Sequence, residues 1–316
     1  MSTHPLGLTV LSVTAETPSI RSIVFGVEGG AIPPWQAGAH IRVALPSGGD
    51  RPYSLMALPG LPKGRLALGV LREQMSTGGS HFMHALKIGD ALQATAPINN
   101  FRLEERVSSA LLLAGGIGIT PILSMAAELK ARGVPYRLHY SGRMPGRLAF
   151  LPQLHAICRT DLFVHYDSGE SRLDITATLN ETAADTHIYV CGPAGMIEAV
   201  KTRALAKGMP AERIHYELFE TQPAKAPDRS FEIELKSTGQ VITVAADQGI
   251  IQALEAAGLN VPYDCRRGVC GVCQCGVVAG VPDHRDVILS DTWKASNKVM
   301  QICVSRAKSE RLVLAL

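Results

Sequence analysis

Four cysteines in the last fifth of the chain have the spacing of a metal centre. Four residues separate Cys265 from Cys270, two separate Cys270 from Cys273, and Cys303 follows after twenty-nine more. The pattern C-x4-C-x2-C with a distant fourth cysteine is typical of plant-type [2Fe–2S] clusters, in which four thiolates bind two irons. We therefore predict that these four cysteines are the metal ligands.

This cysteine loop allows two alternative interpretations, one for the metal and one for the ligand set. Structural zinc sites of four cysteines usually consist of two close pairs, and here only Cys270 and Cys273 form one, so the spacing favours iron and sulfide. Cys275 follows Cys273 by two residues and could compete as a ligand, but the spacing favours Cys273 and places Cys275 on the outgoing strand. Gly268 and Gly271 give backbone N–H groups room to reach the sulfurs.

The composition indicates an ordinary folded protein of more than one domain. The chain has 316 residues, of which 46% are apolar and 19% charged, and its 31 basic residues nearly balance 28 acidic ones. A chain of this length predicts two or three domains, and a balanced charge argues against nucleic-acid binding. The seven cysteines are odd in number and crowded, which favours a metal in a reducing compartment over disulfides.

The sequence suggests neither secretion nor a membrane anchor. The first ten residues have no basic segment followed by an apolar one, so we predict no secretory signal and a cytoplasmic protein. The longest uncharged run, Val107–Ala127, could reach across a bilayer, but it contains glycines and Pro121 in its middle. A strand, a turn and a helix explain this run better.

Residue patterns divide the chain into three parts. Residues 1–106 alternate apolar and polar positions in short runs between turns, which predicts an antiparallel barrel. Residues 107–222 combine apolar strands with helical stretches, which predicts a doubly wound parallel sheet. The segment 221–230 is rich in proline, alanine and charge and is the best linker candidate. It opens the third part, 223–316, in which a hairpin and a short helix precede the cysteine loop.

Two turns in the middle part are candidates for binding a nucleotide. In the first, the apolar strand 111–114 runs into Gly116 and Gly118, and Thr120 and Pro121 are expected as N-cap and first residue of a helix. The N–H groups at such a helix start favour a pyrophosphate, and the glycines let it approach closely. The second turn, 191–195, follows another strand and also opens a helix.

These motifs, in this order, resemble the phthalate dioxygenase reductase family, which includes the vanillate O-demethylase reductase subunits. The resemblance covers essentially all 316 residues. It implies a Greek-key β-barrel that binds FMN, a doubly wound α/β domain that binds NADH, and a β-grasp plant-type ferredoxin domain. It also implies a reductase that serves a Rieske-type oxygenase.

The resemblance assigns flavin-binding roles in the first part. Arg51, Tyr53 and Ser54 resemble the family's R-x-Y-S motif, in which arginine engages the flavin phosphate and the Tyr-Ser pair lines the isoalloxazine ring. A serine hydroxyl there can reach flavin N5, so Ser54 is a predicted catalytic residue. Gly79 and Ser80 resemble the second phosphate-binding element.

Three further features accompany the flavin motifs. Thr77 stands where family members often have an arginine, which removes one expected phosphate contact. The segment 97–101 resembles the strand that closes the family's barrel. His81 and His84 are spaced like metal ligands, but no third ligand is near, and we expect them at the surface or in packing.

The resemblance also assigns roles around the nicotinamide. Cys191, Gly192 and Pro193 resemble a C-G-P motif beside the nicotinamide ring, where a small thiol lets C4 approach flavin N5, so Cys191 is the second predicted catalytic residue. Phe219 falls in a stretch that relatives place near the flavin. Arg143 and Arg147 could accept a 2′-phosphate, whereas NADH is the choice that the resemblance implies.

The expected activity is to accept electrons in pairs from NADH and to pass them on one at a time. Hydride would pass from NADH to FMN, and single electrons would reach the cluster and then a separate oxygenase through a transient contact. We expect a monomer without nucleic-acid or membrane partners. A reductase of another oxygenase class, such as a diiron hydroxylase or a ferredoxin-dependent system, would share these motifs. A redox sensor that uses the cluster is the remaining alternative.

Overall fold

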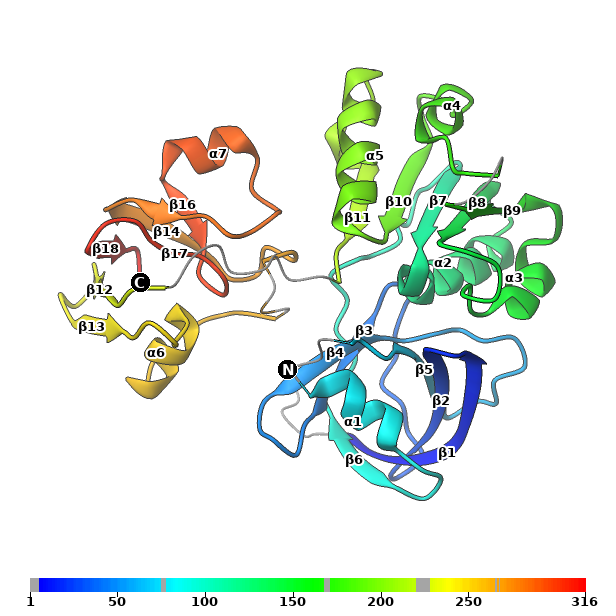
Figure 1. Ribbon diagram of the computed structural model, residues 1–316, viewed down its shortest axis with the longest axis horizontal. Helices are drawn as coiled ribbons and strands as arrows, with labels where there is room; N and C mark the ends of the chain where they lie inside the picture. Colours follow the sequence, from blue (N-terminus) through cyan, green and yellow to red (C-terminus); the bar gives the residue numbers. More distant parts are fainter. Residues whose placement is uncertain (1–5, 75–77, 168–170, 220–227, 265, 267) are drawn as a thin grey trace. The chain divides into compact units, whose positions relative to one another are not determined.

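The computed structural model describes residues 6–74, 78–167, 171–219, 228–264, 266 and 268–316 (Figure 1). The predicted ligand Cys265, Thr77 and most of the predicted linker therefore lie outside the described residues. The chain divides into two compact units, Met1–Leu218 and Phe219–Leu316. Each unit is described by itself.

The first unit begins with one antiparallel sheet of six strands. Their order is β4-β3-β6-β1-β2-β5, a Greek-key arrangement. The inward residues, such as Leu8, Ile23 and Ile41, alternate with outward ones and form a closed apolar cluster. Helix α1, Gly79–Ala85, lies beside β5. The strands are β1 Leu6–Thr17, β2 Ile20–Val27, β3 His40–Ala44, β4 Asp50–Ser54, β5 Arg65–Leu71 and β6 Ala91–Ala94.

The edges of this sheet meet at only a few backbone contacts. Leu55, just after β4, forms an isolated bridge with Leu68 of β5, so the sheet curls back on itself without a continuous closing ladder. The expected closing strand at 97–101 is reduced to another isolated bridge, between His40 and Ile98. The chain turns away there because the Asn99 side chain accepts a hydrogen bond from the N–H of Phe101, at 3.1 Å.

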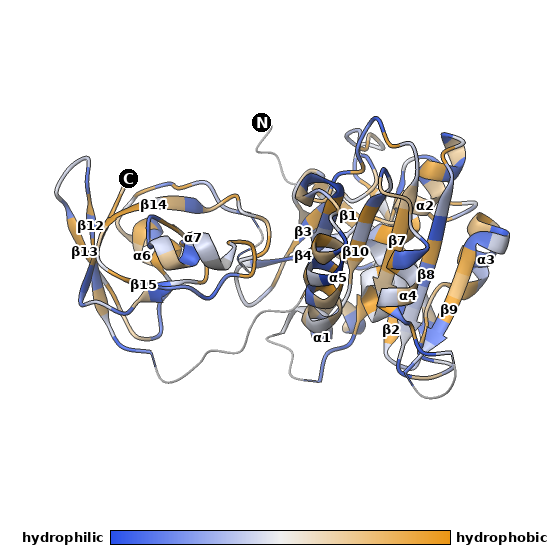
Figure 2. Cartoon of the chain, turned by 90° about the horizontal axis from the view of Figure 1, so that it is seen from above, coloured by the Kyte–Doolittle hydropathy of each residue, from blue (hydrophilic) through white to orange (hydrophobic). Residues whose placement is uncertain are grey.

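A five-stranded parallel sheet completes the first unit. Its order is β11-β10-β7-β8-β9, so the direction of winding reverses between β7 and β10, as predicted for a doubly wound fold. β7 is buried throughout and apolar along its length (Figure 2). The helix pair α2 and α3 packs on one face and the pair α4 and α5 on the other (Figure 1). The strands are β7 Ala110–Gly115, β8 Tyr136–Gly142, β9 Leu162–Tyr166, β10 His187–Cys191 and β11 Ile214–Glu217; the helices are α2 Ile119–Ala131, α3 Leu151–Cys158, α4 Ile175–Asn180 and α5 Ala194–Ala206, with short 3₁₀ turns η1 Gly116–Gly118, η2 Arg159–Asp161 and η3 Ala211–Arg213.

The second unit is an α+β fold around a mixed sheet in the order β13-β12-β18-β14-β16. The predicted hairpin forms β12 and β13, and β12 also pairs in parallel with β18 near the end of the chain. Helix α6 contributes Ile250, Ile251 and Leu254 to the core under this sheet. The elements are β12 Phe231–Leu235, β13 Val241–Val244, α6 Ile250–Ala256, β14 Gln274–Ala279, β15 Pro282–Asp283, α7 Asp291–Ser296, β16 Val299–Gln301, β17 Arg306–Ala307 and β18 Arg311–Leu314.

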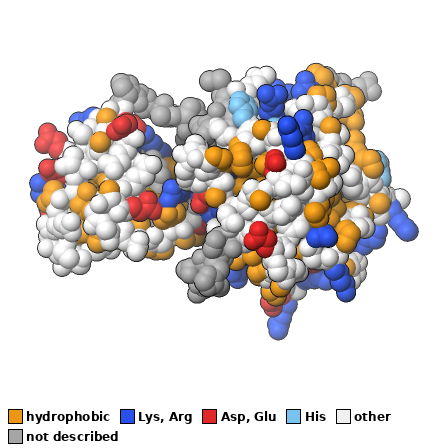
Figure 3. Space-filling model, turned by 90° about the horizontal axis from the view of Figure 1, so that it is seen from below, with side chains coloured by type: hydrophobic (Ala, Val, Ile, Leu, Met, Phe, Trp, Pro, Cys, Tyr) orange, Lys and Arg blue, Asp and Glu red, His pale blue; other side chains and the backbone are white. Residues whose placement is uncertain are grey.

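Charged side chains are mixed on the surface, and the long uncharged run folds as separate elements. On the face drawn in Figure 3, acidic and basic side chains are interspersed with neutral and apolar ones on both units. The uncharged run divides into β7 and α2. Within the described parts of the chain, none of the helices has the length and apolar character needed to cross a bilayer.

Two pairs of histidines lie on neighbouring strands of the parallel sheet. His139 of β8 and His165 of β9 are joined by a 3.0 Å contact between ring nitrogens, and His187 of β10 contacts His215 of β11 at the same distance. Burial lowers the pKa of all four, that of His139 to about 4. His139 is only 6% exposed and stacks on Phe163.

This burial predicts that the first unit loses stability in mild acid. The unfolded chain protonates His139 near its ordinary pKa of 6.5 but the folded chain only near 4, so stability falls as the pH drops through that range. His139→Phe keeps an aromatic ring against Phe163 and removes the titrating group. Calorimetry at pH 7 and pH 4.5 should show that this variant loses about 1–2 kcal/mol less than the parent over that interval.

The matched control is His155→Gln, which changes an exposed histidine of α3. We expect its acid sensitivity to equal that of the parent. An unchanged pH dependence in His139→Phe would show that His139 does not cause the acid sensitivity.

Candidate functional site

The first nucleotide turn is packed backbone against backbone. β7 ends at Gly115, and the 3₁₀ turn Gly116–Gly118 leads directly into α2. A Cβ at Gly118 would lie 2.2 Å from the carbonyl oxygen of Cys191, which leaves no room for any side chain. Glycine is therefore required where the two predicted nucleotide turns meet.

The predicted role of Thr120 as N-cap is wrong. Helix α2 begins at Ile119 with Gly118 as its N-cap, because the glycine turn adopts 3₁₀ geometry and continues smoothly into the helix. Thr120 is buried inside the first turn, and its hydroxyl donates to the carbonyl oxygen of Ile117 at 3.1 Å. Pro121 stays in the first turn, where its missing N–H needs no partner.

The second turn lies against the first from the neighbouring strand. Cys191 ends β10, is fully buried and pairs with Ala114 of β7. A Cβ at Gly115 would lie 2.6 Å from Cδ of Pro193 and 3.2 Å from Cα of Gly192. The structure thus brings both predicted nucleotide motifs together at the point where the strand order reverses, which is where open α/β sheets bind ligands.

A buried serine of α2 joins this turn region to the predicted flavin motif. Ser124, 1% exposed, donates a hydrogen bond to the carbonyl oxygen of Leu55 and accepts one from the N–H of Ala57, both at 2.9 Å. Leu55 directly follows Ser54, so the hydroxyl fixes the end of β4 against α2. No sequence motif indicated Ser124, and a serine inside the apolar stretch 119–126 was the available signal.

The predicted flavin residues come together from two segments. Arg51, Tyr53 and Ser54 lie on β4, and a Cβ at Gly79 would lie 2.6 Å from Cγ of Arg51 and 3.3 Å from the Tyr53 hydroxyl. Ser54 and Ser80 are buried, and burial raises the pKa of Tyr53 above its usual range. The Arg51 guanidinium beside the Gly79–Ser80 turn supplies donors of the kind that a flavin phosphate needs.

The two histidines of α1 bond to the neighbouring backbone, in line with the expectation of a packing or surface role. His81 contacts the carbonyl oxygen of Glu73 and His84 that of Val70, both at 2.9 Å. Ser80 accepts a hydrogen bond from the N–H of Glu73 at 3.2 Å. These contacts fix α1 to the segment that includes the end of β5.

Three predicted residues lie in segments that follow strands. Arg143 and Arg147 are exposed in the segment that follows β8. Phe219, expected as the last residue of a strand, is half-buried and comes after β11 has ended at Glu217. The division into units assigns Phe219 to the second unit.

In the second unit, two of the predicted cluster ligands lie on neighbouring segments. The Cys273 carbonyl accepts a hydrogen bond from the N–H of Ile302 at 3.3 Å, which extends the ladder in which Gln274 pairs with Gln301. Cys303 is the next residue after Ile302. Both cysteines pack with the apolar core of the unit.

The remaining cysteines of the loop differ in their surroundings. Cys270 is half-exposed, whereas Cys275 lies within β14 and faces the core, as expected for a thiol on the outgoing strand. Burial raises the pKa of Cys275 to about 11. Among the described residues no three His, Cys, Asp or Glu side chains are grouped so as to hold a metal ion, and Cys265 lies outside them.

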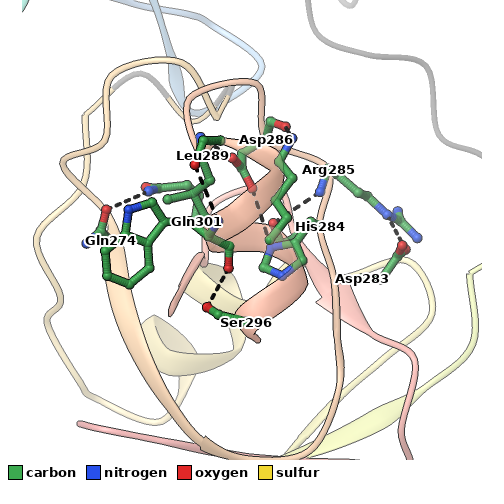
Figure 4. Close-up of polar contacts among 12 residues, drawn as sticks. Gln274, Asp283, His284, Arg285, Asp286, Leu289, Ser296 and Gln301 are labelled. Atoms are coloured by element: carbon green, nitrogen blue, oxygen red, sulfur yellow. Dashed lines mark hydrogen bonds and ion pairs between the residues drawn. The ribbon is translucent and has the colours of Figure 1, made fainter. Parts of the chain in front are cut away.

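The loop packs at Gly268 against the residue Asp286, whose buried carboxylate no sequence motif indicated. Gly268 has a φ of +71°, and a Cβ there would lie 3.0 Å from Cα of Asp286. Asp286 is 1% exposed and accepts a hydrogen bond from the N–H of Leu289 at 2.9 Å (Figure 4). His284 lies beside it, with 3.7 Å between Nδ1 and the carboxylate. Glycine is therefore required at position 268, where the loop packs closely against the segment that carries Asp286.

Comparisons with known proteins agree with this geometry. Residues 112–202 match the oxidoreductase NAD-binding domain family, and residues 233–308 match the 2Fe-2S iron-sulfur cluster binding domain family. The vanillate O-demethylase oxidoreductase of Pseudomonas sp. (strain HR199 / DSM 7063) is 46% identical over 294 residues, which is 92% of each chain. The solved structure of phthalate dioxygenase reductase is 34% identical, with a TM-score of 0.79 over 99% of this chain and 98% of its own.

The chain belongs to the phthalate dioxygenase reductase family. This membership confirms the resemblance, the multidomain fold class and the expected class of oxidoreductase, and the domain matches confirm the NAD-binding and [2Fe–2S] parts. A second solved structure, an intact type IV self-sufficient cytochrome P450 monooxygenase, is 33% identical with a TM-score of 0.77. It covers 99% of this chain, which spans only 41% of that protein.

The contact between the two nucleotide turns predicts a specific defect. Gly118→Ala inserts a Cβ 2.2 Å from the Cys191 carbonyl oxygen and must push the turns apart. We expect the KM for NADH to rise at least about tenfold, since a displacement of about 1 Å is enough to weaken a positioned contact strongly.

Gly249→Ala is the matched control, because a Cβ there would meet only the Gln252 side chain, at 3.7 Å, and the residue precedes α6 in the second unit, outside both nucleotide turns. Steady-state kinetics with an artificial acceptor should leave this control like the parent. A normal KM for NADH in Gly118→Ala would show that this turn is not part of the binding site.

Proposed function

We propose that this chain is the reductase component of a Rieske-type aromatic oxygenase or O-demethylase. It takes electrons from NADH and passes them one at a time, through FMN and a [2Fe–2S] cluster, to a separate oxygenase. The observation that carries the proposal is the hydrogen-bonded junction at Ser124, which holds the Arg51–Ser54 motif against the helix of the nucleotide turn, in a chain that also has a cluster domain. Relatives named for vanillate O-demethylase and phthalate dioxygenase support the class of partner.

The chain's own residues bind and orient the cofactors. The flavin, when bound, supplies the exchange between a two-electron donor and single electrons. Arg51 and Ser80 would hold its phosphate, while Tyr53 would pack on its ring and Ser54 would hydrogen-bond near N5. Gly79 keeps the space beside Arg51 clear of side chains.

The nucleotide is bound by backbone more than by side chains. Gly116 and Gly118 would let the pyrophosphate approach the start of α2, and the Cys191–Pro193 turn would place the nicotinamide. Cys191 is buried and small, so it acts by leaving room for close approach of the rings and transfers no group itself. We propose NADH as the donor, and Arg143 and Arg147 as solvated surface charges.

The four cysteines Cys265, Cys270, Cys273 and Cys303 would hold the cluster. We propose residues 1–106, 107–222 and 223–316 as the FMN, NADH and [2Fe–2S] domains. We also propose that Phe219, close to the second boundary, packs near the flavin. A cytoplasmic monomer that meets its oxygenase transiently completes the proposal.

A reductase for another oxygenase class is the second candidate. The specific observation in its favour is the match to a self-sufficient P450, in which a reductase of this kind is part of an oxygenase chain. The two candidates differ only in the partner. Mixing the purified reductase with a Rieske oxygenase and with a P450 haem domain, and measuring which one accepts electrons, separates them.

The cluster assignment predicts a split between two activities. Cys303→Ser should leave the reduction of ferricyanide by NADH intact, because the flavin can reduce ferricyanide directly. The same variant should abolish cytochrome c reduction, which needs the cluster. Cys275→Ser is the control and should keep both activities and its iron. Survival of both activities in Cys303→Ser would show that the ligand assignment is wrong, and slow NADH oxidation by the parent would favour a redox sensor.

The flavin assignment predicts a loss of affinity. Arg51→Gln removes a charge-assisted contact, which is worth about 1.5–3 kcal/mol, so the Kd for FMN should rise about ten- to a hundredfold. Equilibrium titration of the apoprotein by flavin fluorescence measures it. Arg65→Gln, an exposed arginine at the start of β5, should bind FMN like the parent. Equal affinity in Arg51→Gln would place the phosphate elsewhere.

A further inference from the structure

A buried glutamine contacts one of the proposed cluster ligands. Gln301, in β16, is fully buried, although its neighbours in sequence, Met300 and Ile302, belong to the apolar core. Its side-chain amide accepts a hydrogen bond from Sγ of Cys273 at 3.4 Å. A buried amide costs free energy unless it is hydrogen-bonded, so packing alone does not explain a glutamine at this core position.

The same amide is also bonded to a second glutamine. Nε2 of Gln301 donates to Oε1 of Gln274 at 3.3 Å, and the two side chains point toward each other across the β14–β16 pair (Figure 4). Gln274 is exposed, so its side chain also meets solvent. Cys273, Gln301 and Gln274 therefore form a chain of hydrogen bonds from the buried sulfur to the surface.

The donors and acceptors in this series of hydrogen bonds must exchange roles when Cys273 binds iron. A thiol can donate a hydrogen bond, but a metal-bound thiolate can only accept one. A glutamine amide carries a donor and an acceptor at its two ends, so turning it end for end presents Nε2 to the sulfur and Oε1 to the neighbouring amide. Gln274 can turn in the same way and donate to Gln301.

We propose that, in the cluster-loaded protein, Gln301 donates its side-chain N–H to the Cys273 thiolate and raises the reduction potential of the cluster. The proposal rests on the cluster assignment made above. Reduction adds negative charge to the cluster, and a hydrogen-bond donor on a ligand sulfur stabilises that charge. Full burial strengthens the effect because water screens the contact little.

Gln301 is a positioning residue in this account, since it acts on the cluster through Cys273. An apolar residue of the same length would fill the space and remove the donor. The equilibrium constant for cluster reduction should therefore fall in Gln301→Met, by about three- to tenfold; tenfold corresponds to 59 mV for a one-electron couple.

The test measures the potential of the cluster in the purified holoprotein, with iron content and the visible spectrum as checks of loading. Gln301→Met should keep the iron and shift the potential downward. Gln240→Met changes an exposed glutamine beside the hairpin turn of the same unit and should leave the potential unchanged. A potential in Gln301→Met equal to or above that of the parent would overturn the proposal.

A second measurement does not depend on the variants folding. The parent protein, grown with glutamine labelled with ¹⁵N only in the side-chain amide, should show a ¹⁵N coupling to the reduced cluster in pulsed EPR. The coupling should persist in Gln274→Ala, which retains Gln301. A loaded, reduced parent without this coupling would contradict the hydrogen bond, whereas a parent that binds no iron would instead contradict the proposed function.

Discussion

Close approach of two chain segments at a glycine is the constraint on which each proposed cofactor site depends. Gly118 lies against the carbonyl of Cys191, Gly79 against Arg51, and Gly268 against Asp286, and in each case a Cβ would collide or be tightly crowded. Each pair brings together residues far apart in sequence. Close packing of this kind fixes the positions of the groups proposed to hold the cofactors, and hydride transfer in particular requires closely positioned reactants.

The first unit adds a polar connection to this packing. Ser124 bonds to the backbone on both sides of Met56, through Leu55 and Ala57, so the end of β4 and the start of the nucleotide helix are held together. Gly69 of β5 makes a further close approach, since a Cβ there would lie 2.6 Å from the Thr120 side chain. The two sheets of this unit are thereby joined at the residues proposed to hold the flavin and the nicotinamide.

Local patterns in the sequence predicted the antiparallel strands of the first part and the parallel sheet of the second, because periodicity and turn residues act over a few positions, whereas the Greek-key and β-grasp assignments came from the family resemblance. The helix start was misplaced at Thr120 because a glycine turn can enter a helix through 3₁₀ geometry, which no local pattern distinguishes. Ser124 and Gln301 were missed because their partners lie 69 and 28 residues away, respectively. Contacts of that kind arise only when the sheets assemble.

The central claim is that NADH reduces the flavin, which then reduces the cluster. Rapid anaerobic mixing of the holoprotein with NADH, followed by visible spectroscopy and freeze-quenched EPR, tests it most directly. The account predicts that flavin bleaching comes first and that the signal of a reduced [2Fe–2S] cluster grows afterwards. A cluster that stays oxidised while the flavin is fully reduced, or that is reduced before the flavin, would contradict it.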